Sequence, residues 1–399
     1  MSWTLLAWRL LAHRPAVALL NLAALALGLA ALVFVMVSAD QVSARFERDL
    51  RGVDLVVGAK GSPLQLILAG VFHLDIPPGN IPAGLEAEMA ALPTVARVIP
   101  LSLGDSFRGH RIVGTRHGLI EQHGASLAAG RLWEGPMQAV LGASVAQDTG
   151  LALGASLVGQ HGLGDGGGGH DAHPLTVVGV LAPTGGVIDR LILTDIATVW
   201  QVHEKAVALD DDDRRELEAA REITLLQVAY RTPLAAISLP RWVNARADAQ
   251  AAVPAIEMAR LSRLLGVGSQ LIGAFGAVLL VLAGLSVFAS LYAAVQDRLA
   301  DLAVLRLAGA SRGRLVQVIL LQATGLGCVA LLLGLVLGHG AVALLGQLMA
   351  ADGGLPLSGL WFTPLEGWAV AAAMATVWLA ALAPALKAYR VPVDHLLAG

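Results

Sequence analysis

Residues 16–37 read AVALLNLAALALGLAALVFVMV, a run with no charged side chain and with Asn21 as its one strongly polar residue. A helix needs about 20 mostly apolar residues to cross the hydrocarbon core of a bilayer. The run therefore predicts a first membrane span, at residues 15–38. A cleaved signal peptide is the alternative for such a run near an N-terminus. The length of the run and the amphipathic stretch that follows it favour a retained span.

Three more apolar runs lie in the C-terminal part of the chain and predict spans at 267–295, 316–347 and 364–386. The composition agrees, because 56% of the 399 residues are hydrophobic and 14% are charged, against about a quarter charged in a typical soluble domain. No predicted span carries an acidic or basic residue near its centre, which disfavours an ion-coupled carrier. Glycines recur in these runs and are expected to let helices approach closely, namely Gly273, Gly276, Gly284, Gly325, Gly327, Gly334 and Gly338.

Basic residues flank the four spans unevenly. They lie before the first span, between the second and third, and after the fourth: Arg9, Arg14, Arg298, Arg306, Arg312, Arg314, Lys387 and Arg390. The short 348–363 loop has none. The positive-inside rule then places both termini, the 387–399 tail and the 296–315 loop in the cytoplasm. Residues 1–14 predict an interfacial helix on that side, with Trp3 and Trp8 at headgroup depth.

Residues 39–265 fall on the opposite side of the membrane and predict one large mixed α/β domain between the first and second spans. Helices are expected at Leu85–Leu92 and Asp210–Glu222, and helical stalks at Ser43–Leu50 and 244–265, next to the spans. Short runs rich in Val, Ile or Leu and bounded by Gly or Pro predict strands at Val53–Val57, Ala96–Pro100, Arg111–Gly114, Ala139–Leu141, Leu175–Leu181, Leu191–Thr194 and Thr224–Tyr230.

Motifs for catalysis or cofactor binding are weak in this sequence. The formal charge of −3 is too small to suggest nucleic-acid binding, and the single Cys328 allows no intrachain disulfide. Gly162-x-Gly164-x-x-Gly167 matches a dinucleotide fingerprint in letters, but no strand is predicted before it and no helix after it. No catalytic residue, bound cofactor or metal ligand is assigned, and the chain is not expected to be an enzyme.

A cluster of histidines and acids in the 161–173 loop leaves one alternative open. Imidazoles with nearby carboxylates can bind Zn²⁺, although a solvated loop explains them as well. The cluster consists of His161, Asp165, His170, Asp171 and His173. Whether this loop binds metal stays open from the sequence.

The 297–314 segment, DRLADLAVLRLAGASRGR, predicts a short amphipathic helix at the inner face of the membrane. Leu299, Leu302 and Leu305 share one face at helical spacing. Arg298 lies three residues before Asp301, a spacing at which the two can pair on a helix. Further on, Gly309 can end this helix in the left-handed conformation, and Ser311 can cap the next one.

This segment, continued as LVQVILLQATGLG, resembles the signature of the MacB/FtsX/LolC-type ABC transporter permeases, with its Arg-acid helix and "LR-x-x-GAS". The closing PALKAYRVP (384–392) is similar to the end of that family. The 39–265 domain resembles its periplasmic core in VARVIP (95–100), RIVGT (111–115), LAAGRLWE (127–134), AVLGASVAQDTGLALG (139–154) and LTVVGVLAPTG (175–185). Gln322 departs from the family, which often has a glutamate there.

The resemblance implies a mechanotransmission permease in the bacterial inner membrane. Two copies or paralogues would pair with separate cytoplasmic ATPase subunits, which bind the ATP, and a periplasmic protein is a further possible partner. The cargo would be a lipoprotein, peptide or small molecule exported or extracted from the membrane or periplasm. The residues expected to couple to the ATPase are Arg298, Asp301, Arg306, Gly309, Ala310, Ser311 and Arg312. The alternatives are a zinc-linked ABC system and a non-transport signalling scaffold, and the sequence names neither the cargo nor the direction.

Overall fold

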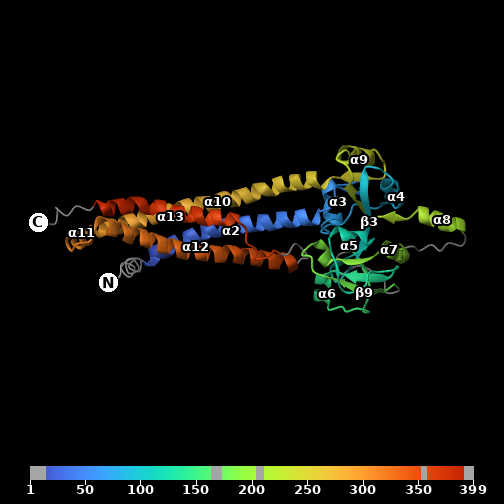
Figure 1. The fold of residues 1–399 in the computed structure, drawn as a ribbon, viewed down its shortest axis with the longest axis horizontal. Coiled ribbons are helices and arrows are strands. Elements are labelled where there is room, and N and C mark those ends of the chain that lie inside the picture. The colour runs from blue at the N-terminus through green and yellow to red at the C-terminus, as the bar shows by residue number, and fades with distance from the viewer. Residues whose placement is uncertain (1–14, 163–172, 204–210, 352–356, 391–399) are drawn as a thin grey trace. The chain divides into compact units, whose positions relative to one another are not determined.

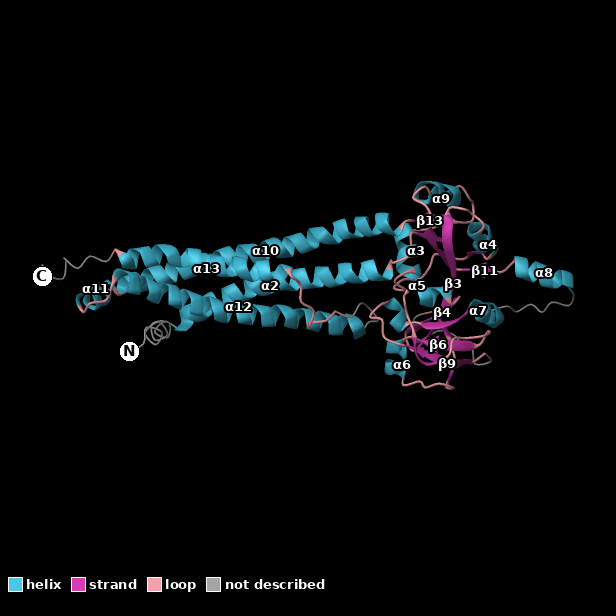
Figure 2. Ribbon diagram, in the orientation of Figure 1, coloured by secondary structure: helices cyan, strands magenta, loops and turns pink. Residues whose placement is uncertain are grey.

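The computed structural model describes residues 15–162, 173–203, 211–351 and 357–390. The chain forms two compact units, a helical unit (Met1–Ser43 and Leu264–Gly399) and an α/β unit (Ala44–Arg263). Figure 1 follows the chain through both units, and Figure 2 separates helices from strands. The predicted interfacial helix at 1–14 and the tail beyond residue 390 lie outside the described residues.

Four long helices build the helical unit: α2 (Pro15–Asp49), α10 (Pro254–Asp297), α12 (Arg312–Ala351) and α13 (Leu365–Tyr389). Each is long and apolar enough to cross a membrane, so the four predicted spans are confirmed as helices. They lie lengthwise beside one another (Figure 1). Their shared core contains Leu29 and Val33 of α2, Val287 of α10, Ala330 of α12 and Ala373 of α13.

Glycines and one polar cluster hold these helices together. A Cβ added at Gly338 would lie 2.8 Å from Val33, and one added at Gly284 would lie 2.6 Å from Thr376. Only glycine permits such approaches, so packing is confirmed there and, with contacts of 2.9 to 3.2 Å, at Gly276, Gly327 and Gly334. Gly273 and Gly325 meet no other helix among the described residues of this chain, so close packing there stays a prediction.

Asn21, the polar residue of the first apolar run, is 2% exposed. Its amide donates to Ser290 Oγ at 2.9 Å and accepts from Ser286 Oγ at 2.5 Å. Buried amides need such partners, and hydrogen bonds between transmembrane helices contribute about 0.6 kcal/mol on average. Asn21 therefore fixes the register of α2 against α10.

The chain between α12 and α13 is tied to the helices by polar contacts. Gln41 of α2 exchanges two hydrogen bonds with the backbone of Ser358, at 2.8 and 2.9 Å. Beyond it, Glu366 in the first turn of α13 accepts from the Thr363 amide at 2.7 Å and lies 2.9 Å from His339 Nε2 of α12. Because Glu366 is at a helix end, the span centres remain free of acidic and basic residues, as expected.

A mixed sheet forms the centre of the α/β unit, with the strand order β13-β1-β12-β3-β4-β10-β6-β9-β5, to which β7 and β8 add at β9 and β3. The β4–β10 and β6–β9 pairs are parallel and the others antiparallel. The strands are β1 (Leu55–Gly58), β3 (Val95–Phe107), β4 (His110–Thr115), β5 (Leu127–Gly130), β6 (Gln138–Leu141), β7 (Ser156–Leu157), β8 (Gln160–His161), β9 (Leu175–Leu181), β10 (Ile192–Asp195), β12 (Leu225–Tyr230) and β13 (Gln250–Ala252); β2 (Ile81–Pro82) pairs with β11 (Glu222–Ile223).

The α/β unit also contains short helices, of which α8 extends away from the sheet (Figure 1). They are α3 (Pro63–Gly70), α4 (Gly84–Ala90), α5 (Gly118–Gln122), α6 (Ala143–Thr149), η1 (Val187–Arg190), α7 (Ile196–His203), α8 (Asp211–Ala219) and α9 (Ala235–Asn244). The main core joins sheet residues such as Leu101, Val113 and Leu193 to Phe72 after α3. The Phe72 ring lies 4.7 Å from that of Phe46 on α2. The final turns of α2 are therefore part of the core of the α/β unit.

All seven strands predicted from the sequence are present, as are the helices at 85–92 and 210–222 with shorter bounds. The second stalk is wrong in its first half. Residues 250–252 form β13, which pairs with β1, and the helix begins only at Pro254. Proline is favoured at the first helical position because its missing N–H has no partner there in any case.

Candidate functional site

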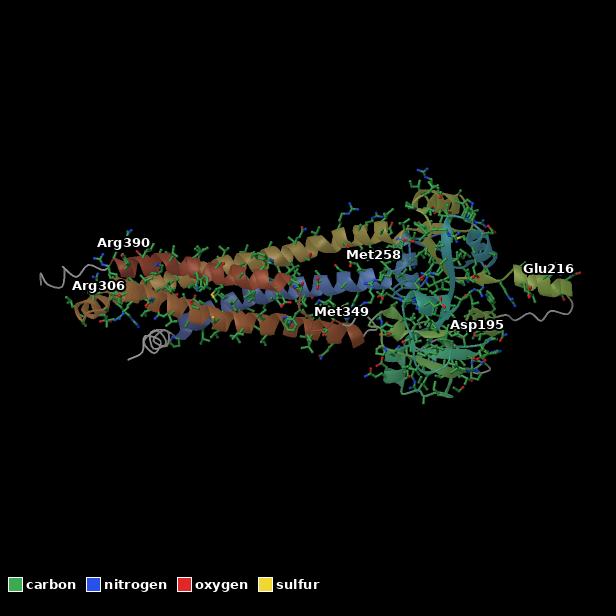
Figure 3. All side chains as sticks on the ribbon, viewed as in Figure 1. Asp195, Glu216, Met258, Arg306, Met349 and Arg390 are labelled. Atoms are coloured by element: carbon green, nitrogen blue, oxygen red, sulfur yellow. The ribbon has the colours of Figure 1, made fainter. Side chains whose placement is uncertain are left out.

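The connection between α10 and α12 contains the residues singled out from the sequence. It consists of the short helix α11 (Leu299–Leu307) and a sharp turn at 308–311. Figure 3 shows Arg306 of α11 at the same end of the helical unit as Arg390, beyond the last turn of α13, and Met349 of α12 toward the other end. The connection and the end of α13 therefore lie at the same end of the helical unit.

Gly309 ends α11 in the conformation that the sequence predicted. Its φ is +93°, in the left-handed region where a side chain is strained. The Gly309 amide donates to the Arg306 carbonyl at 3.0 Å, and the Ala310 amide donates to the Leu305 carbonyl at 3.0 Å. These two bonds form a Schellman motif, which satisfies carbonyls that the helix end would leave unpaired. The turn is therefore locally rigid.

Ser311 starts the next helix, also as predicted. The Arg314 amide lies 3.4 Å from Ser311 Oγ and 3.1 Å from the Ser311 carbonyl, the arrangement of an N-cap. Arg312, the first residue of α12, places its guanidinium 5.7 Å from the ring centre of Tyr389 on α13. A cation over an aromatic face is attracted to it, so this contact ties the start of α12 to the end of α13.

The two faces of α11 differ. Leu299, Leu302 and Leu305 pack against a cluster formed by the helix ends, which includes Val295, Leu315 and Ile319. The shared face predicted for these leucines is confirmed, and it holds α11 against the helical unit.

The opposite face of α11 is open. Val304 is 58% exposed and Leu307 is 54% exposed, and Asp301 beside them is exposed as well. Residues three apart are neighbours on a helix surface, so the three side chains form one patch, which we term the α11 patch. An apolar pair flanked by a carboxylate, held on a rigid helix, suits contact with another protein.

The structure revises parts of the predicted site. Arg298 lies outside the helix, with φ at −117°, and among the described residues no ion pair joins it to Asp301, so that pairing is wrong. Arg306 is half-buried, whereas Gly309, Ser311 and Arg312 are exposed. Sequence reasoning missed Val304 and Leu307, because apolar residues on a predicted interfacial helix are ordinarily assigned to its buried face.

The histidine-rich loop is described only at its ends. His161 Nδ1 lies 3.1 Å from Asp105 Oδ1, whereas Asp165, His170 and Asp171 fall outside the described residues. Among the residues that are described, no group of three or more His, Cys, Asp or Glu side chains could hold a metal ion. Because three of its five residues lie outside the described residues, the zinc alternative stays a hypothesis.

Two protein families match successive parts of the chain. The MacB-like periplasmic core domain matches residues 18–228, which is more than half of the chain. The FtsX-like permease C-terminal domain matches residues 273–393, which include α11 and the turn at Gly309. The chain belongs to the MacB/FtsX-type ABC transporter permeases. The resemblance seen in the sequence is therefore confirmed.

Three solved structures of protein domains are similar to part of this MacB/FtsX-type permease. One is the periplasmic region of MacB from Actinobacillus actinomycetemcomitans, with 14% identity, 53% of this chain and 95% of that chain covered, and a TM-score of 0.36. Another is the extracellular domain of the ABC-type transporter YknZ from Gram-positive bacteria, with 12% identity, 49% and 98% covered, and a TM-score of 0.31. A permease domain from Porphyromonas gingivalis has 14% identity, 49% and 80% covered, and a TM-score of 0.29. No curated protein matches the chain.

Membership of this family fixes the general class of the protein. Its members are multi-pass membrane components of ABC transporters, are generally non-enzymatic, and generally work as dimers with an ATPase partner.

Proposed function

We propose that this permease subunit passes the conformational change of a cytoplasmic ATPase to its α/β unit, and that the α11 patch is the contact. The observation that carries the proposal is the construction of α11. One leucine face anchors the helix to the helical unit, a Schellman turn fixes its end, and the opposite face exposes Val304 and Leu307. A force applied to a rigid, anchored helix moves the helices attached to it rather than deforming the contact.

The proposal places α11 and both chain termini in the cytoplasm. It is supported by the basic residues around the connection, Arg298, Arg306, Arg312 and Arg314, and by Lys387 and Arg390 at the end of α13. The 348–363 loop, which has no Lys or Arg, then lies outside, together with the α/β unit. This is the orientation that the positive-inside rule favours, and it corresponds to the inner membrane of a bacterium.

The roles of the predicted coupling residues follow from their positions. Val304, Leu307 and Asp301 contact the ATPase directly, and exposed Arg312 borders the same surface. Gly309, Ala310 and Ser311 shape the turn, while half-buried Arg306 and the N-terminal Arg298 support the helix from its sides. Apolar side chains at the centre of an interface typically contribute more binding energy than charges at its rim.

In the assembly that we propose, two permease copies or paralogues pair with two ATPase subunits. ATP is bound and hydrolysed on the partner, and this chain holds no cofactor. The α/β unit then acts on a lipoprotein, a peptide or a small molecule taken from the membrane or the periplasm.

Site-specific cross-linking in native membranes tests the contact. In a Cys328→Ser background, Val304→Cys is labelled with a photoactivatable maleimide and irradiated. We expect a cross-linked product that contains an ABC ATPase subunit, identified by mass spectrometry. Leu360→Cys, on the 348–363 loop and 85% exposed, is the matched control and should give no such product. If Val304→Cys yields no ATPase, or if the control yields it equally, the proposed contact is wrong.

A further inference from the structure

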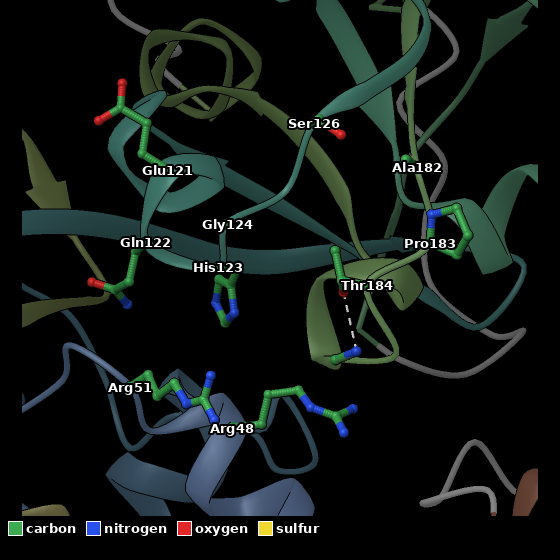
Figure 4. Close-up of a pocket in the computed structure, with 11 residues that line it drawn as sticks. Arg48, Arg51, Glu121, Gln122, His123, Gly124, Ser126, Ala182, Pro183 and Thr184 are labelled. Carbon is green, nitrogen blue, oxygen red and sulfur yellow. Dashed lines mark hydrogen bonds between the residues drawn. The ribbon is translucent and has the colours of Figure 1, made fainter.

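The α/β unit contains a pocket that the proposed ATPase coupling does not use. Its cavity volume is about 440 Å³, and three segments that are far apart in the sequence meet around it. Arg48 and Arg51 come from the end of α2, Gln122 to Ser126 follow α5, and Ala182 to Gly186 follow β9. Figure 4 shows the Arg48 and Arg51 side chains on one side of this pocket, opposite His123 and Thr184.

The two arginines at the pocket have donors to offer. Arg48 Nη1 donates to the Gly185 carbonyl at 2.5 Å, which fixes the guanidinium against the wall but uses only one of its five N–H groups. The Arg51 side chain is exposed and makes no hydrogen bond or ion pair with any described residue. Two guanidinium groups on one cavity match the oxygens of an oxyanion, which such groups bind in bidentate geometry.

Positive charge prevails around the pocket. Burial, with the neighbouring charges of Arg190 and Arg48, lowers the pKa of Arg45, and burial likewise lowers the pKa of Arg190. The arginines in or beside the pocket are Arg45, Arg48, Arg51, Arg97 and Arg190, against the carboxylates Asp49, Glu121 and Asp189. Burial and close guanidinium groups both disfavour further positive charge, so an anion bound here would be stabilised.

Two of the three carboxylates already have partners. Asp49 Oδ1 accepts from the Val187 amide at 3.0 Å. Asp189 accepts from the Thr184 amide and hydroxyl at 3.0 and 2.8 Å and from the Gly185 amide at 2.7 Å. Glu121, which lines the pocket, is exposed to solvent. Asp49 and Asp189 therefore build the pocket wall, and they leave the Arg48 and Arg51 guanidinium groups without a carboxylate partner.

His123 adds a neutral polar group opposite the arginines. Burial, together with the charge of Arg97, lowers its pKa to about 4. At neutral pH the imidazole is therefore uncharged and offers one N–H donor and one acceptor nitrogen. Ser126, with its hydroxyl, also lines the pocket. A ligand with one anionic group and neighbouring hydroxyl or ester oxygens suits this arrangement.

We propose that this pocket binds a phosphate group, held by the guanidinium groups of Arg48 and Arg51 and contributed by a lipid headgroup or by a soluble phosphate ester. The cavity has room for a phosphate and a small substituent, since ligand pockets begin at about 300 Å³. A phosphate held there would join the end of α2 to the 182–186 segment through Arg48. The inference stands independently of the proposed ATPase contact.

Binding to the full-length purified protein tests this inference. The experiment has two arms, one for a soluble phosphate ester and one for a lipid. In the first, equilibrium dialysis in detergent without added phosphate measures the binding of radiolabelled glycerol 3-phosphate. Native mass spectrometry in micelles that contain phosphatidylglycerol, or phosphate-free galactosyl diacylglycerol, measures the lipid arm. We expect the protein to bind a phosphate-bearing probe in at least one arm and not to retain the galactolipid. Binding in the first arm identifies a soluble ester as sufficient, whereas binding only in the second identifies a lipid.

Variants locate the binding. Arg51→Gln should weaken phosphate binding about tenfold or more, because the phosphate would lose a charge-assisted hydrogen bond. The affinity of Arg51→Lys for the probe should lie between that of the unsubstituted protein and that of Arg51→Gln, since lysine keeps the charge and loses the bidentate geometry. Arg241→Gln, an exposed arginine of α9 in the same unit, is the matched control and should bind as the unsubstituted protein does. Absence of binding in both arms, or equal binding by Arg51→Gln and Arg241→Gln, would overturn the proposal.

Discussion

Acidification should loosen the segment that carries His123, because the folded protein resists protonating this side chain. Burial lowers the pKa of His123 from 6.5 to about 4. Above pH 6.5 the imidazole is neutral in both the folded and the unfolded segment, so no stability is lost. As the pH falls from 6.5 toward 4, the unfolded segment takes up a proton that the folded one does not. The free energy of opening should therefore fall across this window and level off below it.

The size of the loss follows from the pKa difference. Each unit corresponds to about 1.36 kcal/mol, so the shift from 6.5 to about 4 gives a loss of about 3 kcal/mol. Hydrogen exchange of the full-length protein measures the free energy of opening at individual amides near His123. The Gly124 and Ala125 amides are protected by the Glu121 and Ile120 carbonyls, both at 3.0 Å, and their exchange should accelerate by about a hundredfold as the pH falls, relative to the intrinsic rate.

His123→Gln is the matched variant, since it keeps a polar side chain of similar size and removes the titration. Other groups in the unit titrate as well, including buried His73, whose pKa burial also lowers. They act equally in both proteins, so the difference between the two exchange profiles isolates His123. Identical pH dependence in the two proteins would refute the reasoning and would mean that His123 is accessible to protons in the folded state.

Three further substitutions test the packing and the turns. Gly338→Val should lower the midpoint of thermal unfolding in detergent, because its Cβ would lie 2.8 Å from a side chain of α2 and overpacking costs about 1–3 kcal/mol. The control, Gly340→Val, should leave the midpoint unchanged, since no atom of another helix lies within 4 Å of its Cβ position among the described residues. Gly309→Val should speed hydrogen exchange in α11, because a side chain at φ +93° is strained by about 1–2 kcal/mol, and Gly313→Val should have a smaller effect. Asp189→Ala should speed hydrogen exchange of the Thr184 and Gly185 amides, because it removes their carboxylate acceptor; leaving such groups unpaired costs about 1–3 kcal/mol. Unchanged exchange of these amides would contradict this role of Asp189.

The sequence predicted the elements whose patterns are long or sharply bounded. Four apolar runs became four long helices, and each predicted strand is present. The prediction for β3 stopped at Pro100, because proline usually ends a central strand. In the structure the strand continues to Phe107, and its two halves pair with different partners, β12 and then β4. The two-residue strands, β5, β13 and the short helices other than α4 and α8 were missed, because tertiary contacts, rather than local patterns, determine them.

The candidate sites divide in the same way. The turn at Gly309 and the cap at Ser311 could be predicted, since they depend on neighbours within a few residues. The exposure of Val304 and Leu307 could not, because it depends on which face of α11 packs against the ends of α10, α12 and α13. The pocket proposed to bind phosphate could not be predicted from the sequence either, since Arg48, His123 and Thr184 come together only in the folded unit.

The most direct test of the central claim is the ATPase activity of the assembled transporter. The full-length permease, reconstituted in nanodiscs with the ABC ATPase that cross-links to it, should stimulate ATP hydrolysis. Val304→Asp combined with Leu307→Asp should abolish this stimulation and weaken assembly at least about tenfold, as loss of central apolar contacts does. Leu360→Asp should leave both unchanged. Stimulation by the double variant equal to that by the unsubstituted permease would contradict coupling through α11.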